Sequence, residues 1–156
     1  MHSFILTPTE STAAPQGCTC GRLRRLTRRI TAVYDRELAA VGLRVTQYSL
    51  LGALQRDAGA DGLPVAELAE QMDMDRTTLT RNLQPLATQG WAELVADTHD
   101  RRVRRARITA AGAAAFAAAR PHWRRAQQAV NSTLGPQSVA ALHQWLDQVT
   151  PAFRPD

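Results

Sequence analysis

The chain has 156 residues, 44% hydrophobic and 21% charged, so it is long enough for a single domain and its composition excludes wholesale disorder. All 19 basic residues are arginine and the net charge is +5, which favours an anionic partner. The longest apolar run, residues 108–119, is too short to span a bilayer, and residues 1–17 lack the pattern of a signal peptide, so we expect a cytoplasmic protein without membrane contact.

The first part of the chain predicts an arm and two helices. Residues 1–17 contain Pro, Gly, Ser and Thr without a helical period, which predicts a flexible arm. Apolar residues then recur every three or four positions over Cys18–Val41, which predicts a long amphipathic helix ended by Gly42. A second helix is expected over Thr46–Asp57, followed by a loop over residues 58–62.

Two shorter helices are expected next. Pro64 is suited to the first position of the shorter one. After a three-residue turn, Asp75 is the expected N-cap of another helix, which ends at Gly90. Because Pro85 removes a backbone hydrogen bond, we expect this helix to bend or loosen early, over residues 81–85.

A hairpin and two more helices complete the chain. Two extended segments, Trp91–Ala96 and Val103–Thr109, are joined by a polar tip and predict a hairpin. Thr109 is the expected cap of an Ala-rich helix that is kinked at Pro121, and Gly135 precedes a last helix. The expected fold is therefore mainly α with a small β-hairpin wing.

The two short helices have the pattern of a helix-turn-helix, in which the second helix enters the major groove of DNA. On the polar face of that helix, Arg81 is suited to guanine and Gln84 to adenine, while threonines suit phosphates and thymine methyls. The same pattern also fits a polar face that contacts only water. The residues of this helix expected to contact DNA are Arg76, Thr77, Thr78, Thr80, Arg81 and Gln84.

The predicted hairpin strengthens the DNA interpretation. Five arginines lie within residues 101–107, immediately after the second helix of the motif. Such a wing can follow the phosphate backbone or enter the minor groove, where the negative potential favours arginine. Asp100 is placed to brace Arg102 through a charge-assisted pair. The wing residues expected at DNA are Asp100, Arg101, Arg102 and Arg104.

Four stretches, in this order and spacing, resemble the multiple antibiotic resistance regulator (MarR) family of bacterial winged-helix transcription factors. They are GLRVTQY at 42–48, VAELA at 65–69, DRTTLTR at 75–81, and 94–112 from LVAD through DRR to ITAAG. The resemblance covers about Arg22–Phe153. It implies a homodimer that acts as a repressor at a pseudo-palindromic duplex operator and is released by a small ligand or by thiol oxidation.

The resemblance also implies a division of the chain. Residues 1–17 are the arm and 18–156 are one domain, in which 18–45 and 110–153 form the dimer and 46–109 bind DNA. The residues themselves support a dimer, because the first and last helices carry apolar stripes that need covering. A partner chain would cover them, and packing within one chain is the alternative.

The effector is expected to act from a cavity at the junction between the dimer helices and the winged-helix lobe, and the two cysteines near the start of the first helix are its leading candidates. If Thr19 caps that helix, Cys20 lies at its positive end, which favours a reactive thiolate, while Cys18 points toward the cationic side. The resemblance implies that Cys20 matches the reactive cysteine of the organic-hydroperoxide-sensing branch and Tyr34 one of its tyrosines. The other tyrosines of that branch are replaced here. Trp123 is a further candidate to line a common cavity with Cys20 and Tyr34.

Several alternatives stay open at this point. The two cysteines are redox sensors, inert residues, or part of a metal sensor, although two thiolates alone do not complete a metal site and the histidines lack ligand spacing. No catalytic spacing, phosphate loop or paired carboxylates point to an enzyme or a cofactor. The alternative function is a helical dimeric ligand-binding or scaffold protein without sequence-specific DNA binding.

Overall fold

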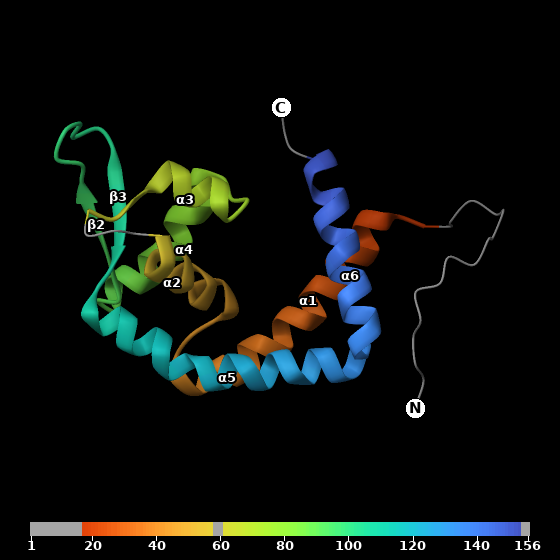
Figure 1. Cartoon of the computed structure of the whole chain (residues 1–156). Coiled ribbons are helices and arrows are strands. Elements are labelled where there is room, and N and C mark those ends of the chain that lie inside the picture. The colour runs from red at the N-terminus through yellow and green to blue at the C-terminus, as the bar shows by residue number, and fades with distance from the viewer. Residues whose placement is uncertain (1–16, 58–60, 154–156) are drawn as a thin grey trace. The chain divides into compact units, whose positions relative to one another are not determined.

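The computed structural model describes residues 17–57 and 61–153 (Figure 1). Its elements in chain order are α1 (Thr19–Leu38), η1 (Ala39–Val41), α2 (Val45–Asp57), β1 (Leu63–Pro64), α3 (Val65–Gln71), α4 (Arg76–Thr88), β2 (Ala92–Ala96), β3 (Arg104–Ile108), α5 (Ala110–Leu134), α6 (Pro136–Val149) and η2 (Thr150–Phe153). The predicted order of helices and hairpin is confirmed. The arm expected over residues 1–17 lies outside the described residues except for Gly17, and so does most of the loop expected after α2.

By its contacts the chain divides into two compact units. The winged unit is residues 34–123, and it holds all three strands together with α2, α3 and α4. Among the described residues, the helical unit is formed by 17–33 and 124–153, which include the first part of α1, the last part of α5, and α6. Within the described residues, no helix is long and apolar enough to cross a membrane.

The core of the winged unit is made mainly of leucine. Leu50, Leu51 and Leu54 of α2 are fully buried, and the leucines that α3 and α4 direct inward join the same cluster. The spacing of three and four residues places these side chains on one side of each helix. Burial of these apolar side chains is what holds the three helices and the sheet together.

The sheet has three antiparallel strands in the order β1-β3-β2, one more than the hairpin predicted from sequence. Ala106 of β3 is buried and stands between Leu63 of β1 and Leu94 of β2. Pro64 was expected to begin a helix, and that expectation is wrong: Pro64 is extended, belongs to β1 and immediately precedes α3. A proline is tolerated there because β1 is an edge strand.

Two helices continue through an internal proline. Loosening of the helix over residues 81–85, one of the two outcomes expected from Pro85, is not found, because α4 runs through Pro85 to Thr88 as one helix. Pro85 lacks a donor for one hydrogen bond, but its carbonyl still accepts from the amide of Gln89 at 3.0 Å. Burial of Leu83 and Leu86 on either side holds this turn against the core. α5 likewise continues through Pro121.

Three predicted helix ends are confirmed. Gly42 follows η1 with a φ of 70°, a left-handed conformation that favours glycine. The Thr109 hydroxyl accepts the amide of Gly112 at 3.0 Å and donates to the carbonyl of Gly90 at 2.6 Å, so it caps α5. Gly135 is the N-cap of α6.

The helical unit exposes much of its apolar surface. None of the residues of α6 is buried, and α1 has one buried residue, Leu38, which belongs to the winged unit. The large apolar side chains that the helical unit exposes are Leu23, Leu26, Trp145, Leu146 and Phe153, the last of them 81% exposed. Exposed apolar surface of this extent is unusual for a protein that acts as a monomer.

Candidate nucleic-acid interface

The start of α4 is organised by Asp75. Its carboxylate accepts hydrogen bonds from the Thr78 amide at 2.8 Å and from the Thr78 hydroxyl at 2.6 Å, so the predicted N-cap is confirmed. The same hydrogen bonds hold the pKa of Asp75 below its usual value. The preceding turn is tight, because Asp73 has a φ of 48°. This turn sets the direction in which α4 leaves α3.

Burial then separates the two faces of α4. Leu79, Leu83 and Leu86 are fully buried or nearly so, and the opposite face is exposed. The sequence-predicted residues on that exposed face are Arg76, Thr77, Thr78, Thr80, Arg81 and Gln84. Such a face carries both the fork of an arginine and the amide of a glutamine, the groups that read base edges.

Two of the predicted threonines are already engaged within the helix. The Thr78 hydroxyl is bound to Asp75, as described above, and the Thr80 hydroxyl donates to the backbone carbonyl of Arg76 at 2.8 Å. The sequence alone did not show that the hydroxyls of Thr78 and Thr80 form these local hydrogen bonds, so it grouped them with Thr77. The long side chains of Arg76, Arg81 and Gln84 therefore dominate the chemistry that the exposed face offers.

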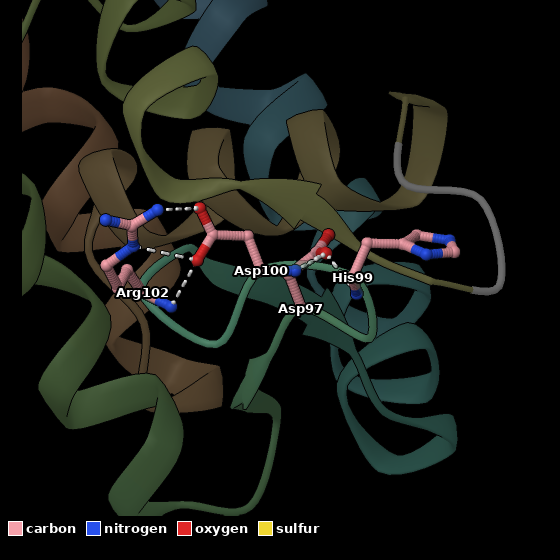
Figure 2. Close-up of polar contacts among 4 residues, drawn as sticks. All are labelled: Asp97, His99, Asp100 and Arg102. Carbon is pink, nitrogen blue, oxygen red and sulfur yellow. Dashed lines mark hydrogen bonds and ion pairs between the residues drawn. The ribbon is translucent and has the colours of Figure 1, made fainter.

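The tip of the wing is a network of hydrogen bonds around two aspartates (Figure 2). One oxygen of Asp97 accepts the amides of His99 at 2.8 Å and Asp100 at 2.9 Å. Asp100 in turn accepts the backbone amide of Arg102 at 3.0 Å and pairs with its guanidinium at 3.1 and 3.3 Å. Arg102 hydrogen bonds lower the pKa of Asp100. The expected brace between Asp100 and Arg102 is present, and it leaves the Arg102 side chain 91% exposed.

The five arginines of the wing fall into different environments. Arg101 and Arg102 are exposed at the tip, and Arg104 donates to the Leu94 carbonyl at 3.4 Å. Arg107 pairs with Glu93 across the two strands at 2.7 Å. The fifth, Arg105, is partly buried and hydrogen-bonded to Asp97 and Gly62. Alternation along β3 places Arg105 and Arg107 on the face opposite the buried Ala106, so the partners of each side chain, rather than strand alternation, distinguish these two arginines.

The candidate effector residues are distributed over both units. Cys18 and Cys20 are free and exposed in the helical unit. Cys18, rather than Thr19, precedes the first helical residue, and its Sγ accepts the amide of Gly21 at 3.4 Å. Cys20 lies in an open groove of about 780 Å³. The groove is lined by Thr19, Cys20, Leu23, Arg24, Thr27, Arg28 and Phe153.

Tyr34 and Trp123 belong to the winged unit, whereas Cys20 belongs to the helical unit. Both pack against the core of that unit. Tyr48 stacks on Trp123 with ring centroids 5.8 Å apart and on Phe116 at 4.7 Å. Burial raises the pKa of Tyr34 above its ordinary value. In the described part of the chain, no group of three or more His, Cys, Asp or Glu is arranged to hold a metal ion.

Comparison with known proteins places this geometry in a family. Residues 41–103 match the sequence profile of the MarR family. The chain is 34% identical to the transcriptional regulator MosR of M. tuberculosis, solved in complex with DNA, with a TM-score of 0.74 over 89% of this chain and 100% of that one. The chain belongs to the MarR family. The resemblance inferred from sequence is therefore confirmed, and so is the mainly helical fold with a small antiparallel sheet.

Two other relatives extend the comparison. The PcaV regulator of Streptomyces coelicolor, solved with its natural ligand, has a TM-score of 0.78 at 21% identity over 92% of this chain and 100% of that one, which shows a shared fold. The transcriptional activatory protein BadR of Rhodopseudomonas palustris (strain ATCC BAA-98 / CGA009) is 35% identical over 77 residues. That match covers 49% of this chain and 44% of BadR, so it spans less than half the length of that relative. In this MarR-family chain, α3 and α4 are the helix-turn-helix, and β2 and β3 form the wing.

Proposed function

We propose that this MarR-family chain is a DNA-binding transcriptional regulator, in which α4 enters the major groove and the wing contacts the neighbouring backbone. The observation that carries the proposal is that one unit presents Arg81 and Gln84 on the exposed face of α4 and Arg102 at the tip of the wing. The DNA-bound structure of MosR, a relative of similar length, supports it. Arginine and glutamine serve direct base readout, and a braced, exposed arginine serves phosphate or minor-groove contact.

The acting form in this proposal is a homodimer. The exposed apolar side chains of the helical unit, among them Leu26, Trp145 and Leu146, need a cover, and a second copy of the chain supplies the same surface. A two-fold dimer presents two copies of α4, so it reads a pseudo-palindromic operator with half-sites about 10 bp apart.

Binding to duplex DNA is the decisive experiment. Selection from a randomised duplex library identifies the operator, and fluorescence anisotropy then measures its affinity over a range of salt concentrations, with light scattering at the same protein concentration. We expect a dimer, an enriched pseudo-palindrome and an affinity that falls steeply as salt rises. A monomer that selects no sequence and shows no salt-dependent binding refutes the proposal and favours a helical ligand-binding or scaffold protein.

Regulation in this proposal comes from an effector that changes the spacing of the two α4 helices. The candidate effector residues are Cys20, Cys18, Tyr34 and Trp123, and the two chemistries are thiol oxidation and a small-molecule ligand. A free thiol in a groove that also contains Arg24 and Arg28 supports the first. An effector acts only through its differential affinity for the two spacings.

The proposed role requires no catalytic step, in keeping with a family of transcriptional regulators. It also places the protein in the cytoplasm, where a bacterial chromosome lies. Whether bound protein represses or activates depends on where the operator lies relative to a promoter, and a reporter gene fused to the selected operator measures the direction.

A further inference from the structure

The segment before β1 passes unusually close to the wing. Gly62 is buried and has a φ of 78°, and a Cβ placed on it would lie 2.8 Å from the backbone oxygen of Ala106 in β3. Only glycine combines this conformation with this approach. Gly62 leads directly through β1 into α3, so the chain that enters the helix-turn-helix is held against the strand that leaves the wing.

Arg105 connects these parts of the winged unit. Its Nη1 donates to the Gly62 carbonyl at 2.8 Å, and its Nε donates to Oδ2 of Asp97 at 2.5 Å. The side chains of Arg105 and Asp97 are only 27% and 10% exposed, in contrast to Arg102. A guanidinium is suited to this task because its planar fork can serve two acceptors at once. Arg105 is thus a partly buried residue of β3 that joins Gly62 to Asp97 at the tip of the wing.

Asp97 connects Arg105 to the other residues of the tip. While Oδ2 binds Arg105, Oδ1 accepts the amides of His99 and Asp100, and Asp100 then holds Arg102. The hydrogen bond from Arg105, together with those amides, keeps the pKa of Asp97 well below its usual range. A continuous series of hydrogen bonds therefore runs from the entry of α3 to the exposed guanidinium of Arg102.

We propose that Arg105 is a positioning residue for DNA binding, which holds the wing at one angle to α3 and α4 by joining Gly62 to Asp97. The proposal rests on the proposed function, since it assigns a role in contact between the wing and DNA. A two-stranded hairpin is marginally stable by itself, and a loose wing would have to be ordered when DNA binds. Holding the wing in advance removes that entropic cost, so Arg105 strengthens binding without contacting DNA.

The positioning role predicts that Asp97→Asn weakens DNA binding, whereas charge alone predicts the opposite. Asp97→Asn removes a negative charge near the DNA-binding surface, so simple electrostatics predicts tighter binding to phosphate. The asparagine carbonyl still accepts the amides of His99 and Asp100, but its NH2 group faces Arg105, donor against donor. The variant therefore keeps an acceptor for the two tip amides and removes the connection that anchors the tip to Arg105.

The test compares four variants with wild type on the selected operator by anisotropy over a salt titration. Asp97→Asn breaks the connection, and Arg105→Lys keeps the charge but replaces the fork with a single point charge. Glu93→Gln is the matched control, because it removes one carboxylate from the same sheet while its partner Arg107 is partly exposed. Arg102→Ala reports whether the wing contacts DNA.

We expect Asp97→Asn and Arg105→Lys to bind about tenfold more weakly than wild type, a size typical of residues that act on a site through others. Their dependence on salt becomes less steep, because contacts from the wing to phosphate are lost. Hydrogen exchange at the amides of residues 98–102 becomes faster in both. Glu93→Gln binds as tightly as wild type or more tightly.

The proposal is overturned if Asp97→Asn binds as tightly as Glu93→Gln and Arg105→Lys binds as tightly as wild type, while Arg102→Ala still weakens binding. If wild type itself shows no salt-dependent binding, the proposed function fails instead. Circular dichroism melting checks that each variant is folded at the assay temperature. If Asp97→Asn is not, the charge-preserving Arg105→Lys decides by the same comparison.

Discussion

Arg102→Ala tests the wing contact most directly, because it removes one charge from the tip without removing any buried side chain. Arg102 is 91% exposed, and its guanidinium pairs with Asp100 of the same turn. The substitution also frees the Asp100 carboxylate, which then repels the phosphates. We therefore expect weaker binding to every duplex sequence rather than a change in base preference.

The size of the effect follows from counting phosphates. If each Arg102 of a dimer neutralises one phosphate, the substitution removes two contacts, and the slope of log affinity against log salt becomes less steep by about 1.8. Between about 50 and 200 mM salt, a fourfold change, the advantage of wild type over the variant should then shrink by about twelvefold. The effect is thus largest at low salt.

Arg107→Ala is the matched control for this measurement. Arg107 also pairs with a carboxylate, that of Glu93, but this pair lies across the two strands and away from the tip. Both variants remove one charge and leave one carboxylate unpaired, so a difference between them reports position rather than charge. Equal slopes for Arg102→Ala and Arg107→Ala, measured by anisotropy in the same salt series, would refute contact between the tip and DNA.

Three further predictions concern stability, pH and the thiols. Gly112→Ala should lower the free energy of unfolding by about 1–3 kcal/mol in urea denaturation, although alanine favours helices, because its Cβ would lie 1.9 Å from the Trp91 carbonyl; unchanged stability would show that the start of α5 can shift. The depressed pKa of Asp97 means that its stabilising contribution is present above the pKa of the unfolded state and is lost as pH falls through the lower folded value. The difference in unfolding free energy between wild type and Asp97→Asn should therefore be constant from pH 7 to about 5 and shrink in stronger acid, and a constant difference down to pH 2 would contradict this. Peroxide should release wild type from its operator but leave Cys20→Ser bound, with a smaller effect for Cys18→Ser; equal release of Cys20→Ser in a gel-shift assay excludes sensing at that thiol and favours a small-molecule inducer.

Local features of the chain were sufficient to predict most helices and the hairpin. The cap at Asp75, the leucines of α4 and the glycine that precedes α6 act within one or two turns, so their pattern is visible in a short window of sequence. The brace between Asp100 and Arg102 was predictable for the same reason, since the two residues are neighbours in one turn. Family membership followed from the order of such stretches.

Other features depended on residues far apart in the chain. The strand β1 has only two residues, and it exists because Leu63 pairs with Ala106. Continuation of α4 through Pro85 depends on burial of its neighbours, which outweighs the lost hydrogen bond. The partial burial of Arg105 accompanies its hydrogen bond to Gly62, 43 positions earlier. In a run of five similar arginines, only the tertiary structure decided which one holds the wing and which ones are free to contact DNA, because side chains of equal charge are distinguished by the acceptors that folding brings to them.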